Sequence, residues 1–265
     1  MEDIRKAIGR PQAGKGPGPY GQGSPQIDHR ELAMRMSPAF QLDRAHLESK
    51  RVVAHDISDP RSSAFDMLRT QVLQTMDLKG WRVLAVTSPT AGCGKTLIAT
   101  NLALSIARLP ERSVLLLELD LRRPRIAATL GLKRELGVLG VLQGKVQLPE
   151  AITPIAVDRY RIDVMIAEQS VPNASEWIAS SRMKALLGLI RRDFPHHIVI
   201  VDTAPMLATD DFLTLLPMID CVLLVGAVGV STISDIENCK RHLNPDTIVR
   251  VVLNKTRENN RPYYG

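Results

Sequence analysis

The sequence has few cysteines, few aromatic residues and no long apolar run, and each shortage excludes a class of protein. Three cysteines in 265 residues show no paired metal-ligand spacing and cannot all pair within one chain, which is typical of a reducing cytoplasm rather than of a disulfide scaffold. The longest uncharged apolar run, residues 221–230, is far shorter than the roughly 20 residues that span a bilayer. Basic residues are scattered without interleaved aromatic residues, which form only 4% of the chain, so we expect no nucleic acid partner.

What the sequence does contain is typical of a globular domain with polar ends. Hydrophobic residues make up 45% of the chain, and the net charge of +6 favours an acidic partner such as a nucleotide. Residues 1–60 are rich in Gly, Pro and Gln and predict a mobile leader, ahead of a folded domain over residues 61–256 and a mobile tail over residues 257–265. The first residues lead into no apolar segment, so we expect no signal peptide, a cytoplasmic location, and membrane association only through a partner.

The chain is organised around a loop of small residues, SPTAGCGKT at positions 88–96. An apolar run before it predicts a buried strand, and apolar residues at helical spacing after it predict a helix. Gly92 and Gly94 allow backbone N–H groups to converge on an anion, toward which the helix directs its positive end. We therefore expect Lys95 to bridge the β- and γ-phosphates of a nucleotide and the Thr96 hydroxyl to ligate Mg²⁺. The usual pattern has a Gly where this chain has Pro89, so a strand-to-helix turn that binds no phosphate stays open on this motif alone.

Two carboxylates follow the next predicted strand. Residues 113–117 form an apolar run that leads into Glu118 and Asp120, which share one face in extended chain. Paired carboxylates at the carboxyl end of a strand can hold Mg²⁺ or accept a proton from an incoming hydroxyl. Arg122 and Arg123 either contact phosphate or cover a helix surface, and the sequence leaves both interpretations open.

The remaining pattern predicts the fold class. Further strands are expected at residues 161–166, 196–203, 221–225 and 248–253, with helical patterns between them and an amphipathic helix over residues 62–78. Continuous apolar strands alternating with helices predict an α/β P-loop NTPase fold, a mostly parallel, doubly wound sheet with helices on both faces. Asp202 ends one of these strands, where it either orients Mg²⁺ or caps the next turn.

Several segments, in this order, resemble the cytoplasmic domains of bacterial tyrosine kinases that regulate capsule and exopolysaccharide export. Residues 88–96 resemble the Walker A loop of that family, residues 115–124 its second Asp-rich motif, and residues 198–205 its Walker B motif. The Asn254 strand end and the Tyr-Tyr-Gly segment are most similar to the exosortase-associated tyrosine autokinases.

The resemblance implies that the chain uses ATP and Mg²⁺ to phosphorylate Tyr263 and Tyr264 in the tail of a neighbouring subunit. It also implies a homo-oligomer, activated at the inner membrane by a separate transmembrane polysaccharide co-polymerase that regulates chain length. The implied catalytic residues are Lys95, Glu118, Asp120 and Asp202, and the implied metal ligands are Thr96, Asp120 and Asp202. The implied nucleotide contacts are Ala91, Gly92, Cys93, Gly94, Lys95, Thr96, Leu97 and Asn254.

Two other functions stay open. A non-catalytic ATP-binding regulator of polysaccharide export is suggested by Pro89, by Glu118 where the family usually has Asp, and by a helix in which only Arg69 fits the Glu-x-x-Arg-x-x-Arg oligomerisation pattern. A partition ATPase of the Min or Par kind shares the predicted fold. Those proteins carry an extra Lys early in the phosphate loop, and residues 87–94 contain none.

Overall fold

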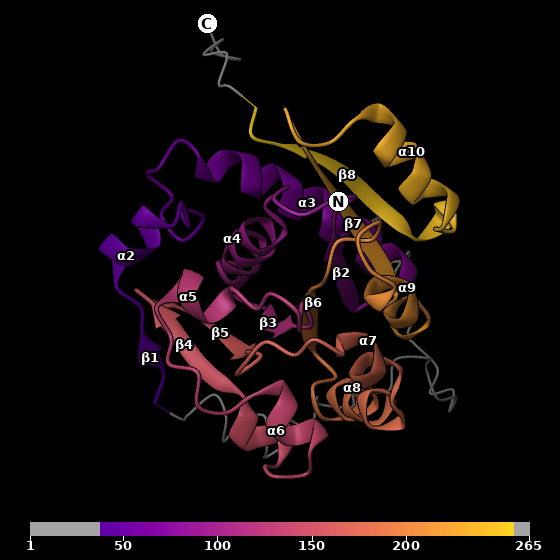
Figure 1. Cartoon of the computed structure of the whole chain (residues 1–265). Helices are drawn as coiled ribbons and strands as arrows, with labels where there is room; N and C mark the ends of the chain where they lie inside the picture. The colour runs from indigo at the N-terminus through magenta and orange to yellow at the C-terminus, as the bar shows by residue number, and fades with distance from the viewer. Residues whose placement is uncertain (1–37, 257–265) are drawn as a thin grey trace, which may run out of the picture.

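The chain folds around one eight-stranded sheet with the strand order β1-β4-β5-β3-β6-β2-β7-β8 (Figure 1). A computed structural model describes residues 38–256. The strands are β1 (Phe40–Gln41), β2 (Val83–Thr87), β3 (Ser113–Glu118), β4 (Thr153–Val157), β5 (Tyr160–Met165), β6 (His197–Asp202), β7 (Cys221–Ala227) and β8 (Ile248–Asn254). The α-helices are α2 (Arg44–Ser49), α3 (Ser62–Lys79), α4 (Lys95–Ala107), α5 (Ile126–Leu130), α6 (Val138–Leu142), α7 (Ala174–Ala179), α8 (Ser181–Asp193), α9 (Asp211–Leu215) and α10 (Ile233–Arg241).

The central strands β3, β6, β2 and β7 are parallel, and their carboxyl ends lie at one edge of the sheet. Asp202 pairs in register with Val86 on one side and with Glu118 on the other, so the ends of β2, β6 and β3 are level. Ligands of open α/β sheets bind at this edge, and the fold therefore brings the predicted phosphate loop and acidic strand ends together.

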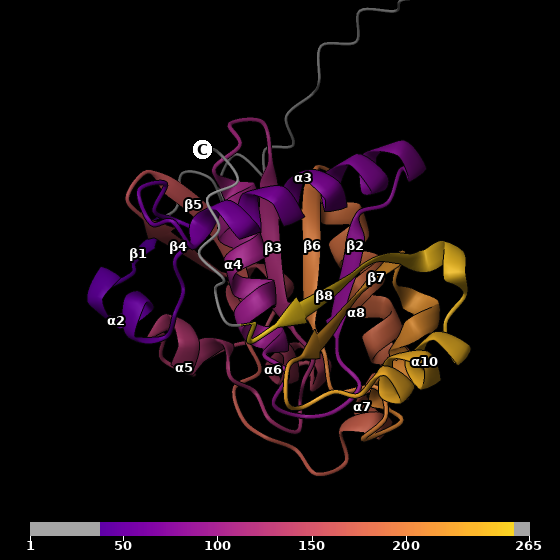
Figure 2. The same ribbon diagram turned by 90° about the horizontal axis from the view of Figure 1, so that it is seen from above.

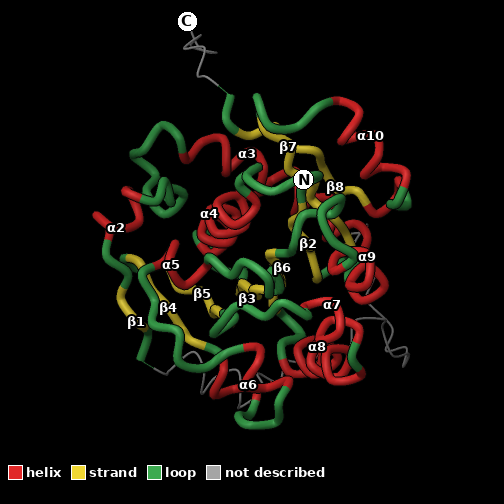
Figure 3. Tube along the Cα trace, viewed as in Figure 1, coloured by secondary structure: helices red, strands yellow, loops and turns green. Residues whose placement is uncertain are grey.

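Helices cover both faces of the sheet because alternate strand residues point to opposite sides. Leu116 of β3 belongs to the same core cluster as Val72 of α3 and Leu102 of α4, whereas Leu115 packs in the cluster that contains Leu186 of α8. Figure 2 shows β3, β6 and β2 side by side, and Figure 3 shows the helices on the two sides of the strands. Within residues 38–256, no helix is long and apolar enough to cross a membrane.

The third predicted strand, residues 161–166, corresponds to β5, but the structure adds a partner that the sequence pattern did not predict. β4 pairs with β5 in antiparallel direction, so the sheet is mixed at this side. The two strands are joined by the residues Asp158 and Arg159, and Asp158 has a φ of 56°, as tight hairpin turns require. Arg44 of α2 forms an ion pair with Asp158 and so holds the turn.

The prediction that residues 1–60 form a mobile leader is wrong for residues 38–60. β1 pairs with β4, and Leu47 and Val52 are fully buried in the main core. The side-chain oxygen of Asn101 on α4 accepts hydrogen bonds from the backbone N–H groups of Val53 and Ala54 at 2.8 and 2.9 Å. This stretch folds through a few buried residues and one buried amide, without a repeat long enough to show as periodicity. The leader residues 1–37 and the tail residues 257–265 lie outside the described residues.

Candidate nucleotide-binding site

The phosphate loop joins β2 to α4 and has the backbone that its glycines predicted. Gly92 and Gly94 have φ values of 83° and 93°, in the left-handed region that favours glycine. Gly94 caps the N-terminus of α4, and a Cβ there would overlap Nδ2 of Asn254. The loop therefore ends where the positive end of a 13-residue helix begins, which is a suitable place for a phosphate group.

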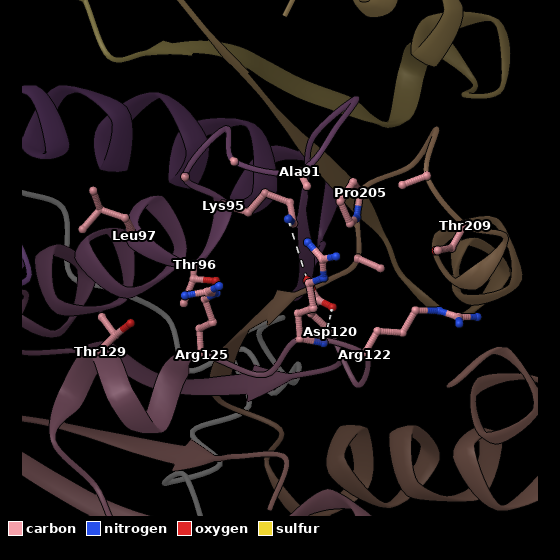
Figure 4. Close-up of a pocket in the computed structure, with 15 residues that line it drawn as sticks. Ala91, Lys95, Thr96, Leu97, Asp120, Arg122, Arg125, Thr129, Pro205 and Thr209 are labelled. Atoms are coloured by element: carbon pink, nitrogen blue, oxygen red, sulfur yellow. Dashed lines mark hydrogen bonds and ion pairs between the residues drawn. The ribbon is translucent and has the colours of Figure 1, made fainter. Parts of the chain in front are cut away.

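A cavity of about 730 Å³ opens over this loop at the carboxyl edge of the sheet (Figure 4). Its lining comes from the phosphate loop, the start of α4, the segment after β3 and the segment after β6. The lining residues are Ala91, Gly92, Gly94, Lys95, Thr96, Leu97, Asp120, Arg122, Arg123, Arg125, Thr129, Ala204, Pro205, Ala208 and Thr209. The volume and the mixture of cationic and small residues fit a nucleotide.

Lys95 and Asp120 face each other across this cavity. The ammonium nitrogen of Lys95 lies 3.8 Å from Oδ2 of Asp120, and both side chains are about nine-tenths buried. Figure 4 shows the lysine directed toward the carboxylate. Burial raises the pKa of Asp120, and the nearby ammonium of Lys95 opposes that rise. The ion pair holds Lys95 over the loop, where the phosphates of a nucleotide would compete with Asp120 for it.

Asp202 lies below the loop at the end of β6 and holds the Thr96 side chain. The Thr96 hydroxyl donates a 2.6 Å hydrogen bond to Oδ2 of Asp202. Burial raises the pKa of Asp202 to about 7, against the opposing effects of Lys95 and the Thr96 hydrogen bond. The second carboxylate oxygen, Oδ1, is buried and has no hydrogen-bond partner among residues 38–256. A buried acceptor beside a threonine hydroxyl fits a hydrated Mg²⁺ ion, which would satisfy it.

The metal fit depends on the nucleotide as well as on the chain. Residues 38–256 contain no group of three or more His, Cys, Asp or Glu side chains that could hold a metal ion. Mg²⁺ in nucleotide sites keeps several waters and takes phosphate oxygens as ligands, so Thr96 and Asp202 are a sufficient protein contribution. Asp120, the third expected ligand, lines the same cavity.

Glu118 does not lie where the paired-carboxylate prediction put it. Its carboxylate is fully buried, accepts hydrogen bonds from the backbone N–H groups of Arg125, Ile126 and Ala167, and does not line the cavity. Burial raises the pKa of Glu118, and the three backbone donors oppose the rise. The reason is that β3 ends at Glu118, so the period of two no longer applies at Asp120. Glu118 therefore anchors the segment that carries Asp120, and the structure gives it no contact with the cavity.

The arginines after Asp120 have different surroundings. The Arg122 guanidinium forms two hydrogen bonds with the buried carboxylate of Asp211, at 2.8 and 3.0 Å, which ties this segment to α9. Arg123 lines the cavity, and so does Arg125, which the sequence analysis missed. The signal that could have found it is the basic series Arg122, Arg123, Arg125 directly after an acidic strand end.

Two of the expected nucleotide contacts lie behind the loop. The thiol of Cys93 is buried and donates to the backbone oxygen of Thr90 at 3.3 Å, so it does not line the cavity. Nδ2 of Asn254 donates a 2.9 Å hydrogen bond to the backbone oxygen of Cys93, which joins the end of β8 to the phosphate loop. Ala91 and Leu97 line the cavity as expected, whereas Tyr263 and Tyr264 lie outside the described residues.

These features define a class of protein. A glycine loop leads into a helix that begins with the buried Lys95 and the half-buried Thr96, and an acidic strand end lies beside it at the carboxyl edge of a parallel sheet. These are the features of a P-loop nucleotide-binding domain. Residues 84–263 match the model of the CobQ/CobB/MinD/ParA nucleotide binding domain, and the chain belongs to that family. The predicted fold class is thereby confirmed.

Comparisons with known proteins point to one branch of this fold. The tyrosine-protein kinase Etk of Escherichia coli K12 is 29% identical over 210 residues, which are 78% of this chain and 28% of Etk. The chain therefore spans little more than a quarter of the length of that relative. The solved structure of the kinase domain of the Escherichia coli tyrosine kinase Etk superposes with a TM-score of 0.67 at 30% identity, covering 77% of this chain and 79% of that structure. The septum site-determining protein MinD of Pyrococcus horikoshii, complexed with Mg-ADP, shares the fold at a TM-score of 0.51 and 17% identity, covering 65% of this chain and 69% of that one. The predicted resemblance to bacterial tyrosine kinases is confirmed.

Proposed function

We propose that the chain is an ATP-dependent protein-tyrosine kinase of a bacterial polysaccharide export system, and that its acceptors are Tyr263 and Tyr264 of a neighbouring copy. One observation carries this proposal. Among residues 38–256, Asp120 is the one carboxylate that lines the nucleotide cavity, and it pairs with the lysine of the phosphate loop. A base and a phosphate-binding cation thus lie at one reaction centre, as transfer to a hydroxyl requires.

The reaction can be assigned to these residues. Lys95 and the N-terminus of α4 bind the phosphates of ATP, which releases Asp120 from its ion pair. Asp120 then accepts the proton of the phenol as the phenol oxygen bonds to the γ-phosphorus and the bond from that phosphorus to the bridging oxygen of ADP breaks. A pKa raised by burial makes Asp120 a stronger base than an exposed aspartate. Mg²⁺, when bound, neutralises charge on the phosphates, and Thr96 and Asp202 are the residues that would hold it.

The partners follow from the same proposal. A second copy supplies the acceptor tyrosines, and a transmembrane polysaccharide co-polymerase, a separate polypeptide, supplies activation at the cytoplasmic side of the inner membrane. The likeness to the Etk kinase domain supports the kinase part of this proposal, and the two partners rest on the family resemblance of the sequence.

The test is phosphotyrosine mass spectrometry of the purified full chain after incubation with ATP and Mg²⁺. We expect phosphate on Tyr263 and Tyr264, and none in the Lys95→Met variant, which lacks the phosphate-binding ammonium. A Tyr263→Phe, Tyr264→Phe double variant should bind ATP normally and stay unmodified. Full ATP binding by the unaltered chain with no phosphotyrosine, even in the presence of the membrane partner, would contradict the proposal.

That result would favour a second function, a non-catalytic ATP-binding regulator of polysaccharide export. This alternative rests on Glu118, whose carboxylate accepts hydrogen bonds from three backbone N–H groups and does not line the cavity. Asp120 therefore has no second acid beside it there. A partition ATPase is disfavoured because the phosphate loop lacks the extra lysine of that group.

A further inference from the structure

Arg125 is a cation of the nucleotide cavity that the kinase chemistry proposed above does not use. It follows Asp120 on the segment between β3 and α5, and it lines the cavity together with the phosphate loop. Figure 4 shows its side chain directed from that segment toward Thr96, at the start of α4. The guanidinium therefore faces the side of the cavity at which the phosphates of a nucleotide would lie.

The guanidinium of Arg125 has no partner in the part of the chain that the structure describes. Arg125 is exposed, and among residues 38–256 no carboxylate forms an ion pair with its guanidinium and no acceptor takes a hydrogen bond from it. The neighbouring Arg122 differs, because its guanidinium donates hydrogen bonds to Asp211 and to the backbone oxygen of Pro172. Arg125 is thus available to an anionic ligand, whereas Arg122 is occupied.

The backbone of Arg125 is held in place although its side chain is unpaired. The buried carboxylate of Glu118 accepts a hydrogen bond from the backbone N–H of Arg125. The guanidinium of Arg134 donates a 2.8 Å hydrogen bond to the backbone oxygen of Pro124, the residue directly before Arg125. A side chain on an anchored backbone loses less conformational freedom on binding than one on a mobile loop, so this arginine is prepared for a ligand.

The other charges of the cavity leave Arg125 to the phosphates. Lys95 is paired with Asp120, and of the arginines in the lining Arg123 and Arg125 form no ion pair with a carboxylate of residues 38–256. The charge of Arg123 acts on Asp120, where it opposes the burial that raises the pKa of that carboxyl. MgATP carries about two net negative charges and MgADP about one, so the terminal phosphate of ATP is the group that a further unpaired guanidinium would favour.

We propose that the guanidinium of Arg125 binds the terminal phosphate of ATP. Lys95 and Asp120 face each other across the cavity, and the phosphoryl group that is transferred must lie near both the cation and the base. Arg125 comes from the same segment as Asp120, so it approaches that group from the side opposite to the phosphate loop. Its planar fork offers a phosphate two parallel N–H donors. The inference rests on the proposed function for the use of ATP, although its test does not require kinase activity.

Isothermal titration calorimetry of the nucleotide-free full chain tests this contact without phosphoryl transfer. In the presence of Mg²⁺, the chain is titrated with ADP and, separately, with the non-hydrolysable ATP analogue in which an imido group replaces the oxygen between the β- and γ-phosphorus. Arg125→Ala should weaken binding of the analogue by at least about tenfold, because charge-assisted hydrogen bonds to an arginine contribute a factor of that order. The affinity for ADP, which lacks the terminal phosphate, should change by less than about twofold.

Two further variants locate the contact. Arg125→Lys should weaken binding of the analogue less than Arg125→Ala does, because lysine keeps the charge but loses the planar fork. Arg241→Ala on α10, which removes an exposed arginine outside the cavity, is the matched control and should change neither affinity. Alanine at position 125 retains the backbone N–H that Glu118 binds, so we expect the variant to fold, and thermal melting checks this.

Two results would overturn the proposal: an unchanged affinity of Arg125→Ala for the analogue, or an equal loss of affinity for the analogue and for ADP. The second result would assign Arg125 to general attraction of anions and not to the terminal phosphate. A chain that phosphorylates its tyrosines while Arg125→Ala binds the analogue normally refutes the present inference alone. A chain that shows the selective loss but forms no phosphotyrosine refutes the proposed function alone.

Discussion

Asp202 should make the nucleotide-free chain less stable as the pH rises toward neutrality. Its pKa is about 7 in the folded chain against an ordinary value of 3.8, so the folded state holds the proton more tightly than the unfolded state does. The resulting stabilisation is fully present below pH 3.8 and is lost as the pH rises to about 7, which amounts to roughly 4 kcal/mol over the whole range. Between pH 5.5 and 7.5 the same relation gives a loss of about 2 kcal/mol from this one group.

Urea unfolding at pH 5.5 and 7.5, without nucleotide or Mg²⁺, measures this effect in the unaltered chain and in Asp202→Asn. Asparagine keeps the shape and can still accept the Thr96 hydrogen bond, but it does not titrate. We expect the loss of unfolding free energy between the two pH values to be about 2 kcal/mol smaller in the variant. The comparison with the variant removes the contributions of all other titrating groups.

Asp220→Asn is the matched control. Burial favours a raised pKa for Asp220, but hydrogen bonds from Arg191 and from the backbone of Arg82 and Val83 outweigh it and lower the pKa. Its titration therefore lies below pH 5.5, and its removal should cost the same stability at both pH values. An Asp202→Asn variant with the pH dependence of the unaltered chain would refute the assignment of the raised pKa to this carboxyl.

Two further substitutions test the support of the site. Glu118→Gln should lower the unfolding free energy by about 1–3 kcal/mol and weaken ATP binding in calorimetry, because an amide cannot accept hydrogen bonds from all three backbone donors. Glu237→Gln, at an exposed position, is the control. An unchanged ATP affinity of Glu118→Gln would contradict the anchoring role. Gly94→Ala should abolish ATP binding for two reasons: the added Cβ overlaps the Asn254 side chain, and alanine is strained at the positive φ of this position. Adding Asn254→Ala should relieve the overlap but not the backbone strain. Normal ATP binding by Gly94→Ala would contradict this account.

Local sequence signals predicted the central part of the fold well. β2, β3, β6 and β7 are continuous apolar runs, and such runs are visible without knowledge of their partners. β4 was missed because its partly exposed first half and Pro154 give no continuous apolar run, and its place is set by the pairing with β5. Residues 38–60 were assigned to a leader because their order depends on contacts with Asn101 and β4, which lie far away in the sequence.

The candidate site shows the same division. Lys95 and Thr96 were predictable because a phosphate loop has a fixed spacing relative to its helix. Asp202 lies beside Lys95 and Thr96 because of the register of β6 with β2. Its place at the end of a predicted strand was the sequence signal for this position. Glu118 was misplaced because a rule for extended chain was applied to Asp120, two residues beyond the end of the strand. The backbone donors that hold Glu118 come from two separate segments.

The placement of residues 38–60 has a practical consequence for the choice of boundaries. A shortened chain that begins at residue 61 would remove the backbone donors that Asn101 binds. It would also expose the apolar core side chains against which Leu47 and Val52 pack. Such a fragment would be prone to aggregation, and its inactivity in an assay would say nothing about the chemistry of the parent chain.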